Sequence, residues 1–279
     1  MELKSVGRLI SSSWERGQEK FLNLRSRAHF LAPTVLGMPI RGPLIQFYRN
    51  DDTFETELSL VNYMSYFSPD EAVTQAYSLT VYNREGKSLA SAQVDLKPGE
   101  TFQQNLSTLF AGKLDHFGVF AVNTSYFPKY SKKIEFLGET SPQFMTLFVP
   151  KDGMSGPQMI HSHKRFETWP VPVGKSTRAS GCVEDLRELT KLDIFILNSG
   201  PARIKGRIQF NDLSTKAPLK TMEFQAAGHG VAQLTLEKTE LQSMNAPVSM
   251  RIDHNRLIQQ RKPILFRTTK SGFVSCNHL

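Results

Sequence analysis

The sequence predicts an all-β protein, with two tandem immunoglobulin-like antiparallel β-sandwiches from an internal duplication and a short N-terminal helical segment before them. Three observations lead to this fold class. Short segments of continuous or alternating apolar residues begin near residue 44 and run to the C-terminus. Turn-forming clusters such as SPDE, NREGK and KPGE separate them at the close spacing that is typical of antiparallel sandwiches. The order of the first half then recurs in the second.

Composition defines the broad class of the protein. Of the 279 residues, 39% are apolar, enough to bury a sizeable core in one large domain or two of ordinary size. Two cysteines, Cys182 and Cys276, imply no disulfide framework. The N-terminus lacks the apolar run and cleavage site of a secretory signal, and no stretch of about 18 apolar residues occurs. We therefore expect a cytoplasmic protein.

Residues 1–32 form the first predicted region, a basic amphipathic helical segment. Its apolar residues recur at helical spacing, and they are Leu3, Val6, Leu9, Ile10 and Trp14. Lys4, Arg8 and Arg16 occupy the other faces. Such a segment packs its apolar stripe on its own protein or on a partner subunit. The alternative is a peripheral contact of residues 1–31 with an anionic membrane surface.

The first sandwich is predicted to span residues 33–150, starting with the Pro- and Gly-rich stretch PTVLGMPIRGP. Its expected strands are LIQFY, ELSLVNY, AYSLTVYN, AQVDL, TFQQNL, GVFAVN, KIEFL and QFMTLFV. The second is predicted to span 151–279, with an insertion at 164–191. Its expected strands are QMIHSHKRF, LDIFILN, RIKGRIQFND, KTMEFQ, GVAQLTL, VSMRID, KPILFR and GFVSCN. Within the insertion, CVEDLRELTKL is expected to form one or two helical turns.

Several pairs of segments support the duplication. ELSLVN of the first half matches DIFILN of the second, so that both units contain an apolar strand ending in Asn. Ile134 and Phe136 match Ile264 and Phe266 at a constant offset of 130 residues. On the same reasoning, QMIHSHKRF is the first strand of the second unit and corresponds to LIQFYRN.

The stretch ILNSGPARIKGRIQFNDLSTKAPLKTMEF and the late strand Pro263-Ile264-Leu265-Phe266 resemble the immunoglobulin-like sandwich of the sensory rhodopsin transducer family. The resemblance covers most of each half and consists of strand patterning. It implies a non-catalytic sandwich that binds a ligand or transduces a signal.

Charge divides unevenly along the chain, whose net charge is +8. Residues 33–150 carry 9 Lys/Arg and 12 Asp/Glu, whereas residues 151–279 carry 19 and 11. An acidic half joined to a basic half suggests that one docks onto the other, within a chain or between copies. We therefore expect self-association or an acidic partner.

His161 and His163 in MIHSHK are the candidate metal ligands. On one β-strand, their spacing places both imidazoles on the same face. A metal site needs a third ligand, and no second close motif supplies it. The alternatives are a solvent-facing edge strand or a pair that titrates at an interface. A metal ion is the only cofactor that the sequence suggests.

A basic strand provides the first candidate ligand-binding surface. Arg203, Lys205 and Arg207 alternate, so they share one face of the predicted strand RIKGRIQFND. Such a face suits an acidic protein or a glycan, or is simply solvated. Nucleic acid is disfavoured, because no aromatic residues suited to base stacking are interleaved with these cations.

Tyrosines of the first half provide the second candidate surface. Tyr63, Tyr66, Tyr126 and Tyr130 fall in predicted loops or strand ends beside Asn and Asp residues. Aromatic rings beside hydrogen-bonding groups are typical of carbohydrate sites. The alternative is that these rings close the ends of the sandwich.

These observations favour a non-enzymatic binding or adaptor protein with a protein or carbohydrate ligand, and one that self-associates. The chain contains no G-x-S-x-G elbow and no phosphate-binding loop, so we assign no catalytic residue. The alternative function is a metal-binding protein or metal-dependent enzyme that uses His161 and His163.

Overall fold

The computed structural model describes residues 44–62, 74–124, 144–161, 163–164, 181–198, 200, 203–244, 246–254 and 263–278. The chain divides into two compact units, Met1–Ile40 and Arg41–Leu279, and every described residue belongs to the second. The helical segment predicted at residues 1–32 therefore lies outside the described residues. No helix among the described residues is long and apolar enough to span a membrane.

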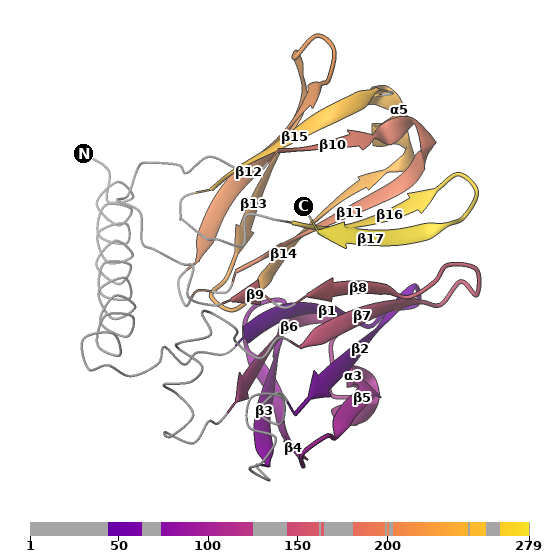
Figure 1. The fold of residues 1–279 in the computed structure, drawn as a ribbon. Coiled ribbons are helices and arrows are strands. Elements are labelled where there is room, and N and C mark those ends of the chain that lie inside the picture. The colour runs from indigo at the N-terminus through magenta and orange to yellow at the C-terminus, as the bar shows by residue number, and fades with distance from the viewer. Residues whose placement is uncertain are drawn as a thin grey trace, which may run out of the picture. The chain divides into compact units, whose positions relative to one another are not determined.

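The described part of the chain is all-β, which confirms the predicted fold class (Figure 1). The first-half strands are β1 (Leu44–Arg49), β2 (Phe54–Val61), β3 (Gln75–Asn83), β4 (Ser88–Leu96), β5 (Thr101–Asn105), β6 (Phe117–Thr124), β7 (Met145–Pro150), β8 (Gln158–His161) and β9 (His163–Lys164). They form antiparallel sheet A, in the order β4-β3-β6-β1-β9, and antiparallel sheet B, in the order β5-β2-β7-β8.

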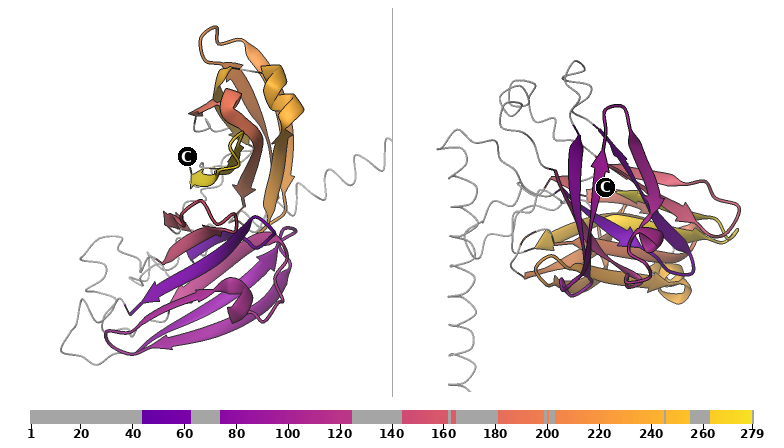
Figure 2. Two further views of the ribbon diagram at one scale, coloured as in Figure 1. Left: turned by 90° about the vertical axis from the view of Figure 1, so that its right-hand side faces the viewer. Right: turned by 90° about the horizontal axis from the view of Figure 1, so that it is seen from below.

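The second-half strands, which run from orange to yellow in Figure 1, are β10 (Gly181–Asp185), β11 (Leu189–Leu197), β12 (Ile204–Asp212), β13 (Pro218–Ala226), β14 (Val231–Glu237), β15 (Pro247–His254), β16 (Ile264–Thr269) and β17 (Val274–His278). They form sheet C, in the order β10-β15-β12-β13, and sheet D, in the order β14-β11-β16-β17. Figure 2 shows the same strands from two further directions.

The two halves share one strand order. If β10 is matched to β1 and each later strand to its successor, sheet C repeats the order of sheet A, apart from the extra β9, and sheet D repeats that of sheet B. The register irregularity between Val81 and Tyr82 also recurs between Phe210 and Asn211 on the matching strand. Descent of both halves from one ancestral unit stays a prediction.

The structure corrects the assignment of QMIHSHKRF. β8 pairs with β7 in sheet B, and β9 pairs with β1 in sheet A, so this segment completes the first sandwich. The first strand of the second sandwich is β10, which pairs with β15. Gly156-Pro157 before Met159 and Ile160 resembles Gly42-Pro43 before Leu44 and Ile45 in the sequence. This short likeness does not identify equivalent strands, because pairing with β7 and β1 decides where the segment lies.

Two further expectations differ from the structure. CVEDLRELTKL contains strand β10, a single 3-10 turn η2 (Leu186–Glu188) and the start of β11, so the predicted helical turns are wrong apart from that turn. β7 holds the place in sheet B that β16 holds in sheet D, so KIEFL is not the counterpart of KPILFR. KIEFL itself lies outside the described residues. The short helices α3 (Leu106–Leu109) and α5 (Lys238–Met244) were not predicted.

The Asn that follows each matched apolar strand has a structural role. Asn62 and Asn198 are fully buried. The Asn62 side-chain amide donates to the Leu96 carbonyl over 2.9 Å, and that of Asn198 donates to the Ala227 carbonyl over 2.7 Å. Both amides therefore satisfy carbonyl groups at the end of a strand in the opposite sheet, which would be costly to bury unpaired.

Each pair of sheets encloses its own core. Leu58 and Leu60 of sheet B pack with Leu79 and Val81 of sheet A. In the second half, sheets C and D enclose an equivalent cluster that includes Ile194, Ile208, Phe210 and Leu265. Both halves are thus β-sandwiches with interiors of aliphatic and aromatic side chains.

A third cluster, here called the inter-sandwich cluster, joins the two sandwiches. Its members come from both halves, and they are Ile45, Phe47, Phe54, Val119, Ala121, Phe148, Ile160, Phe195, Leu197, Val231, Ile264, Phe266 and Val274. Phe47 and Phe195 lie 4.5 Å apart between ring centroids, and Phe54 and Phe266 lie 4.7 Å apart in an edge-to-face arrangement. Such aromatic pairs add about 1 kcal/mol each to the effect of area burial.

The cluster explains why LIQFY is apolar without alternation. All six residues of β1 are buried. Leu44 and Tyr48 face the core of the first sandwich, whereas Ile45 and Phe47 face the inter-sandwich cluster. A strand that is covered on both faces has no solvent-facing positions, and LIQFY is therefore apolar except for Gln46, which is buried as well.

Arg49, the last residue of β1, carries a charge into this contact. Its side chain is 6% exposed, and its Nε lies 2.6 Å from Asp51 Oδ2. Its Nη2 lies 3.4 Å from Oδ2 of Asp193 on β11, whose side chain is 4% exposed. The guanidinium carbon also lies 4.7 Å from the centroid of the Phe266 ring. Arg49 thus connects the first sandwich to a carboxylate and an aromatic ring of the second.

Burial opposes ionisation of Asp51, but the adjacent Arg49 guanidinium and the backbone N–H groups of Thr53 and Phe54 hold its pKa below the ordinary value. The Oδ1 atom of Asp193 accepts a 2.6 Å hydrogen bond from Thr235. Both carboxylates are thus oriented by neighbouring hydrogen-bond donors.

The loops at one end of the contact approach so closely that only glycine fits. A Cβ atom on Gly86, which has a φ of +80°, would lie 1.9 Å from the Gly228 carbonyl oxygen. A Cβ atom on Gly230 would lie 2.5 Å from the Arg84 carbonyl oxygen, and Val231 N–H donates to that oxygen over 3.0 Å. The β3–β4 turn therefore packs backbone to backbone on the β13–β14 turn.

We expect Arg49→Met to lower the free energy of unfolding by about 3 kcal/mol, because Asp193 stays buried with a weaker cation, Lys191, at 3.6 Å. The double variant Arg49→Met/Asp193→Leu should recover most of this loss, since an apolar pair needs no desolvated charge. Urea unfolding followed by circular dichroism in the β-sheet region measures both. A double variant no more stable than Arg49→Met would contradict this account.

The effect of the close backbone approach can be separated from that of backbone strain. Gly99 has a φ of +78°, similar to that of Gly86, but nothing lies within 4 Å of its Cβ position. We expect Gly99→Ala to cost about 1 kcal/mol through the unfavourable φ alone. Gly86→Ala should cost more than about 2 kcal/mol, because it also forces the two turns apart. Equal melting temperatures for the two variants would show that the turns do not pack in solution.

Candidate functional site: the basic face of sheet C

The structure places three of the predicted ligand-binding residues together. Lys205 and Arg207 lie on β12, Arg203 directly precedes this strand, and all three are exposed. Between them, Ile204 and Ile208 are fully buried in the core. The period-2 alternation of the sequence therefore puts the cations on the outer face of sheet C, as predicted from the pattern.

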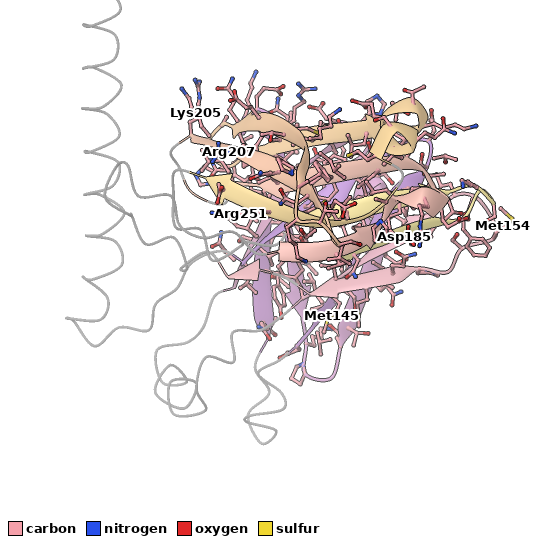
Figure 3. All side chains as sticks on the ribbon, turned by 90° about the horizontal axis from the view of Figure 1, so that it is seen from above. Met145, Met154, Asp185, Lys205, Arg207 and Arg251 are labelled. Carbon is pink, nitrogen blue, oxygen red and sulfur yellow. The ribbon has the colours of Figure 1, made fainter. Side chains whose placement is uncertain are left out.

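The neighbouring strand β15 adds a fourth cation and a carboxylate. In the antiparallel register, Arg207 pairs with Asp253, and Gln209 pairs with Arg251. Figure 3 shows Lys205 and Arg207 succeeding one another, with Arg251 on the adjacent strand. The signal for these residues is the alternation in VSMRIDH, where Arg251 and Asp253 share the outer face and Met250 and Ile252 the core. The sequence prediction did not include them in the site.

Asp253 orients two arginines of this face. Arg251 Nε donates to Asp253 Oδ1 over 3.2 Å, and Arg207 Nε lies 3.7 Å from Oδ2. The Asp253 side chain is only 10% exposed, whereas those of Arg207 and Arg251 are 59% and 57% exposed. One nearly buried carboxylate thus holds two guanidinium groups that remain open to solvent. We name Arg207, Arg251 and Asp253 the arginine pair and its anchor.

The rest of the face has mixed polarity. Glu223 of β13 lies opposite Arg207 on the side away from Asp253, and Thr221 lies opposite Gln209. At the end of β10, the Arg187 side chain hydrogen-bonds to Asp185 and lowers the pKa of that carboxyl to about 2. Four cations around two carboxylates on β12, β13 and β15 leave this part of the face positive, so an anionic group is its natural ligand.

The two predicted metal ligands, His161 and His163, do not lie on a single strand. The His161 backbone pairs with Met145 in sheet B, whereas the His163 backbone pairs with Ile45 in sheet A. The chain passes from one sheet to the other between them, so the rule that residues i and i+2 share a strand face does not apply. Among the described residues, no three His, Cys, Asp or Glu side chains are grouped to hold a metal ion. Metal binding stays a prediction, and it lacks the single-strand site that suggested it.

The four tyrosines of the predicted carbohydrate surface, Tyr63, Tyr66, Tyr126 and Tyr130, all lie outside the described residues. The glycan reading of that surface stays a prediction. Conversely, the structure contains a buried ion pair, Arg49–Asp193, that no sequence motif predicted. The two residues belong to different sandwiches, and local sequence spacing does not predict contacts between residues so far apart in the chain.

Cys276 is a half-buried free thiol on β17. Burial raises the pKa of its thiol to about 12, even though Arg267 and Arg49 favour the thiolate. Its backbone N–H donates to the side-chain carbonyl of Gln158, whose amide nitrogen lies 3.4 Å from the Val274 carbonyl oxygen. The Gln158 side chain therefore hydrogen-bonds to the edge of β17 as a neighbouring strand would. These hydrogen bonds connect the two sandwiches in addition to the Arg49–Asp193 ion pair.

The models of known protein families and the curated proteins contain no match to this chain. The resemblance to the sensory rhodopsin transducer family thus stays a prediction. The fold defines the class of the protein: an all-β chain with a β-sandwich architecture.

We expect native Cys276 to react with iodoacetamide at pH 8 on the order of 1,000-fold more slowly than the unfolded chain, because a thiol with a pKa near 12 supplies almost no thiolate at that pH. Peptide mass spectrometry distinguishes Cys276 from Cys182. Alkylation of Cys276 at the same rate in buffer and in urea would contradict the assigned burial.

Proposed function

We propose that this chain is a non-enzymatic binding or adaptor protein, and that it binds an acidic protein or carbohydrate ligand on the outer face of sheet C. The observation that carries the proposal is the arginine pair held by Asp253. An arginine that is already oriented loses less side-chain entropy when it binds than a free surface cation does. An anchored pair is therefore better prepared for a ligand than scattered lysines are.

The chemistry of the ligand follows from the guanidinium groups. Both contacts with Asp253 use Nε, so within the described residues the terminal Nη groups keep their hydrogen-bond donors for a ligand. A guanidinium matches the paired oxygens of a carboxylate or sulfate with two parallel hydrogen bonds. Acidic side chains of a protein and acidic sugars both carry such groups. Lys205 and Arg203 add longer-range attraction.

A face of mixed polarity favours binding over catalysis. No aromatic residue occupies the outward positions of β12, which are Lys205, Arg207, Gln209 and Asn211. Stacking of unpaired bases, which single-stranded nucleic acids require, has no platform on this strand. A protein or glycan partner therefore fits this face better than a single-stranded nucleic acid does. A cytoplasmic location is part of the same proposal.

Titration of the full chain with poly-L-glutamate and with a heparin oligosaccharide tests the proposal. We expect saturable binding of at least one of them at low ionic strength, weakened by salt because the contacts are exposed charges. Arg207→Gln/Arg251→Gln should reduce the affinity at least about tenfold, which corresponds to roughly 1.4 kcal/mol.

A matched control separates the arginine pair from net charge. Lys97→Gln/Lys113→Gln removes the same charge from exposed turns of the first sandwich. This control should bind like the unaltered chain. The proposal would be wrong if neither polymer binds, or if both double variants lose affinity equally.

A further inference from the structure

The contact between the two sandwiches uses one kind of face from each. The first sandwich contributes the outer face of sheet A, through Ile45 and Phe47 of β1 and Val119 of β6. Core-facing positions of the sheet B strands add Phe54, Phe148 and Ile160, so the outer face of sheet B takes no part. The second contributes the outer face of sheet D, through Phe195 of β11 and Phe266 of β16. In the matched strand order, sheet C is the counterpart of sheet A, and sheet B is the counterpart of sheet D. The chain therefore leaves one face of each kind outside this contact: sheet C and sheet B.

The outer face of sheet B is apolar where a solvated face would be polar. Thr146 and Phe148 of β7 are fully buried, and the alternate residues Met145, Leu147 and Val149 are partly exposed. Across the register from Leu147 stands Met159 of β8, which is 64% exposed. A strand with one solvated face normally alternates apolar and polar residues. Apolar side chains on the outward positions indicate a surface that a partner covers.

Glu57 on the adjacent strand β2 lies beside this apolar strip, and its position matches that of Asp193 in the second sandwich. Glu57 precedes Asn62 by five residues, and Asp193 precedes the equivalent Asn198 by five. Glu57 pairs with Leu147 across the register as Asp193 pairs with Phe266. Glu57 therefore occupies the place in sheet B that Asp193, the acceptor of Arg49, occupies in sheet D.

The two carboxylates differ in their partners. Asp193 faces Arg49 of the other sandwich. Glu57 accepts a hydrogen bond from the Gln103 amide, and neighbouring Glu55 accepts one from the Ser107 hydroxyl. Within the described residues, no cation forms an ion pair with Glu55 or Glu57. The sheet B face thus presents two oriented negative charges beside an apolar strip.

We infer that the partner of this face is a second copy of the chain, whose sheet C face docks on it. The inference rests on the proposed function, with the Glu55 and Glu57 carboxylates of one copy as the acidic ligand of the arginine pair of the next. The two faces are complementary in charge, because sheet C carries the arginine pair and sheet B carries the two carboxylates. Val183, which is 59% exposed, stands in sheet C where Phe47 stands in sheet A, and it meets the apolar strip.

The mode of assembly follows from the two different faces. A contact between unlike surfaces is heterologous, so it extends into a ring or an open chain rather than stopping at a symmetric dimer. Each surface is a single sheet face with many polar groups, so the association belongs to the small, transient class of interfaces. Exposed charges contribute much of it, and salt therefore weakens it.

Sedimentation velocity of the full chain gives the first test. At low ionic strength, the mean mass should rise above the 31.5 kDa of one chain as the concentration increases, and it should return toward that value at high salt. Glu57→Lys and, separately, Arg207→Gln/Arg251→Gln should each remain monomeric. Glu188→Lys, a matched reversal at an exposed residue of η2, should associate like the unaltered chain.

Mixing gives the decisive test. Glu57→Lys retains an intact sheet C face, and Arg207→Gln/Arg251→Gln retains an intact sheet B face. An equimolar mixture should form a 1:1 dimer that grows no further, because the two remaining faces are no longer complementary. A monomeric mixture overturns the inference, as does a dimer formed by either variant alone or a chain that is monomeric under all conditions. If the monomeric chain still binds poly-L-glutamate or heparin through the arginine pair, only this inference fails and the proposed function stands.

Discussion

The burial of Arg49 against Asp193 is the constraint on which the rest of the structure depends. A guanidinium and a carboxylate that are nearly excluded from water stabilise a fold only when each has its partner in place. Here the partners come from different sandwiches, and three phenylalanine rings lie around the guanidinium. The pair therefore defines the register of the contact, while the surrounding aromatic and aliphatic side chains supply most of the favourable free energy.

This constraint determines which surfaces remain for function. The outer faces of sheets A and D meet through apolar side chains of β1, β6, β11 and β16, so these positions are not open to a ligand. The outer faces of sheets B and C stay outside this contact, and their residues diverge in character. Sheet C carries an anchored arginine pair, and sheet B carries carboxylates beside exposed methionine. The two sandwiches share one strand order, but different residues on their outer faces decide which faces pack within the chain and which remain available for a ligand.

The prediction from sequence succeeded where local periodicity carries the information. Alternation placed Lys205 and Arg207 on one outer face, and short apolar segments marked β1 and β11 as strands. It failed where the partner strand decides the outcome. MIHSHK reads as one strand, yet its two histidines pair with different sheets. The helix expected in CVEDLRELTKL became strand β10, because hydrogen bonds to β15 outweighed the weak local preference of this segment.

By itself, the sequence determined the all-β class, most of the strands and the basic character of the second half, because these depend on residue type and on a spacing of two. Only the tertiary structure decided that Asp253 anchors Arg207 and Arg251, that Arg49 reaches Asp193, and that QMIHSHK completes the first sandwich. Each of these depends on which strands become neighbours, and strand pairing is set by contacts between residues far apart in the chain. A one-dimensional pattern records the face on which a side chain lies, but it does not record what lies opposite that face.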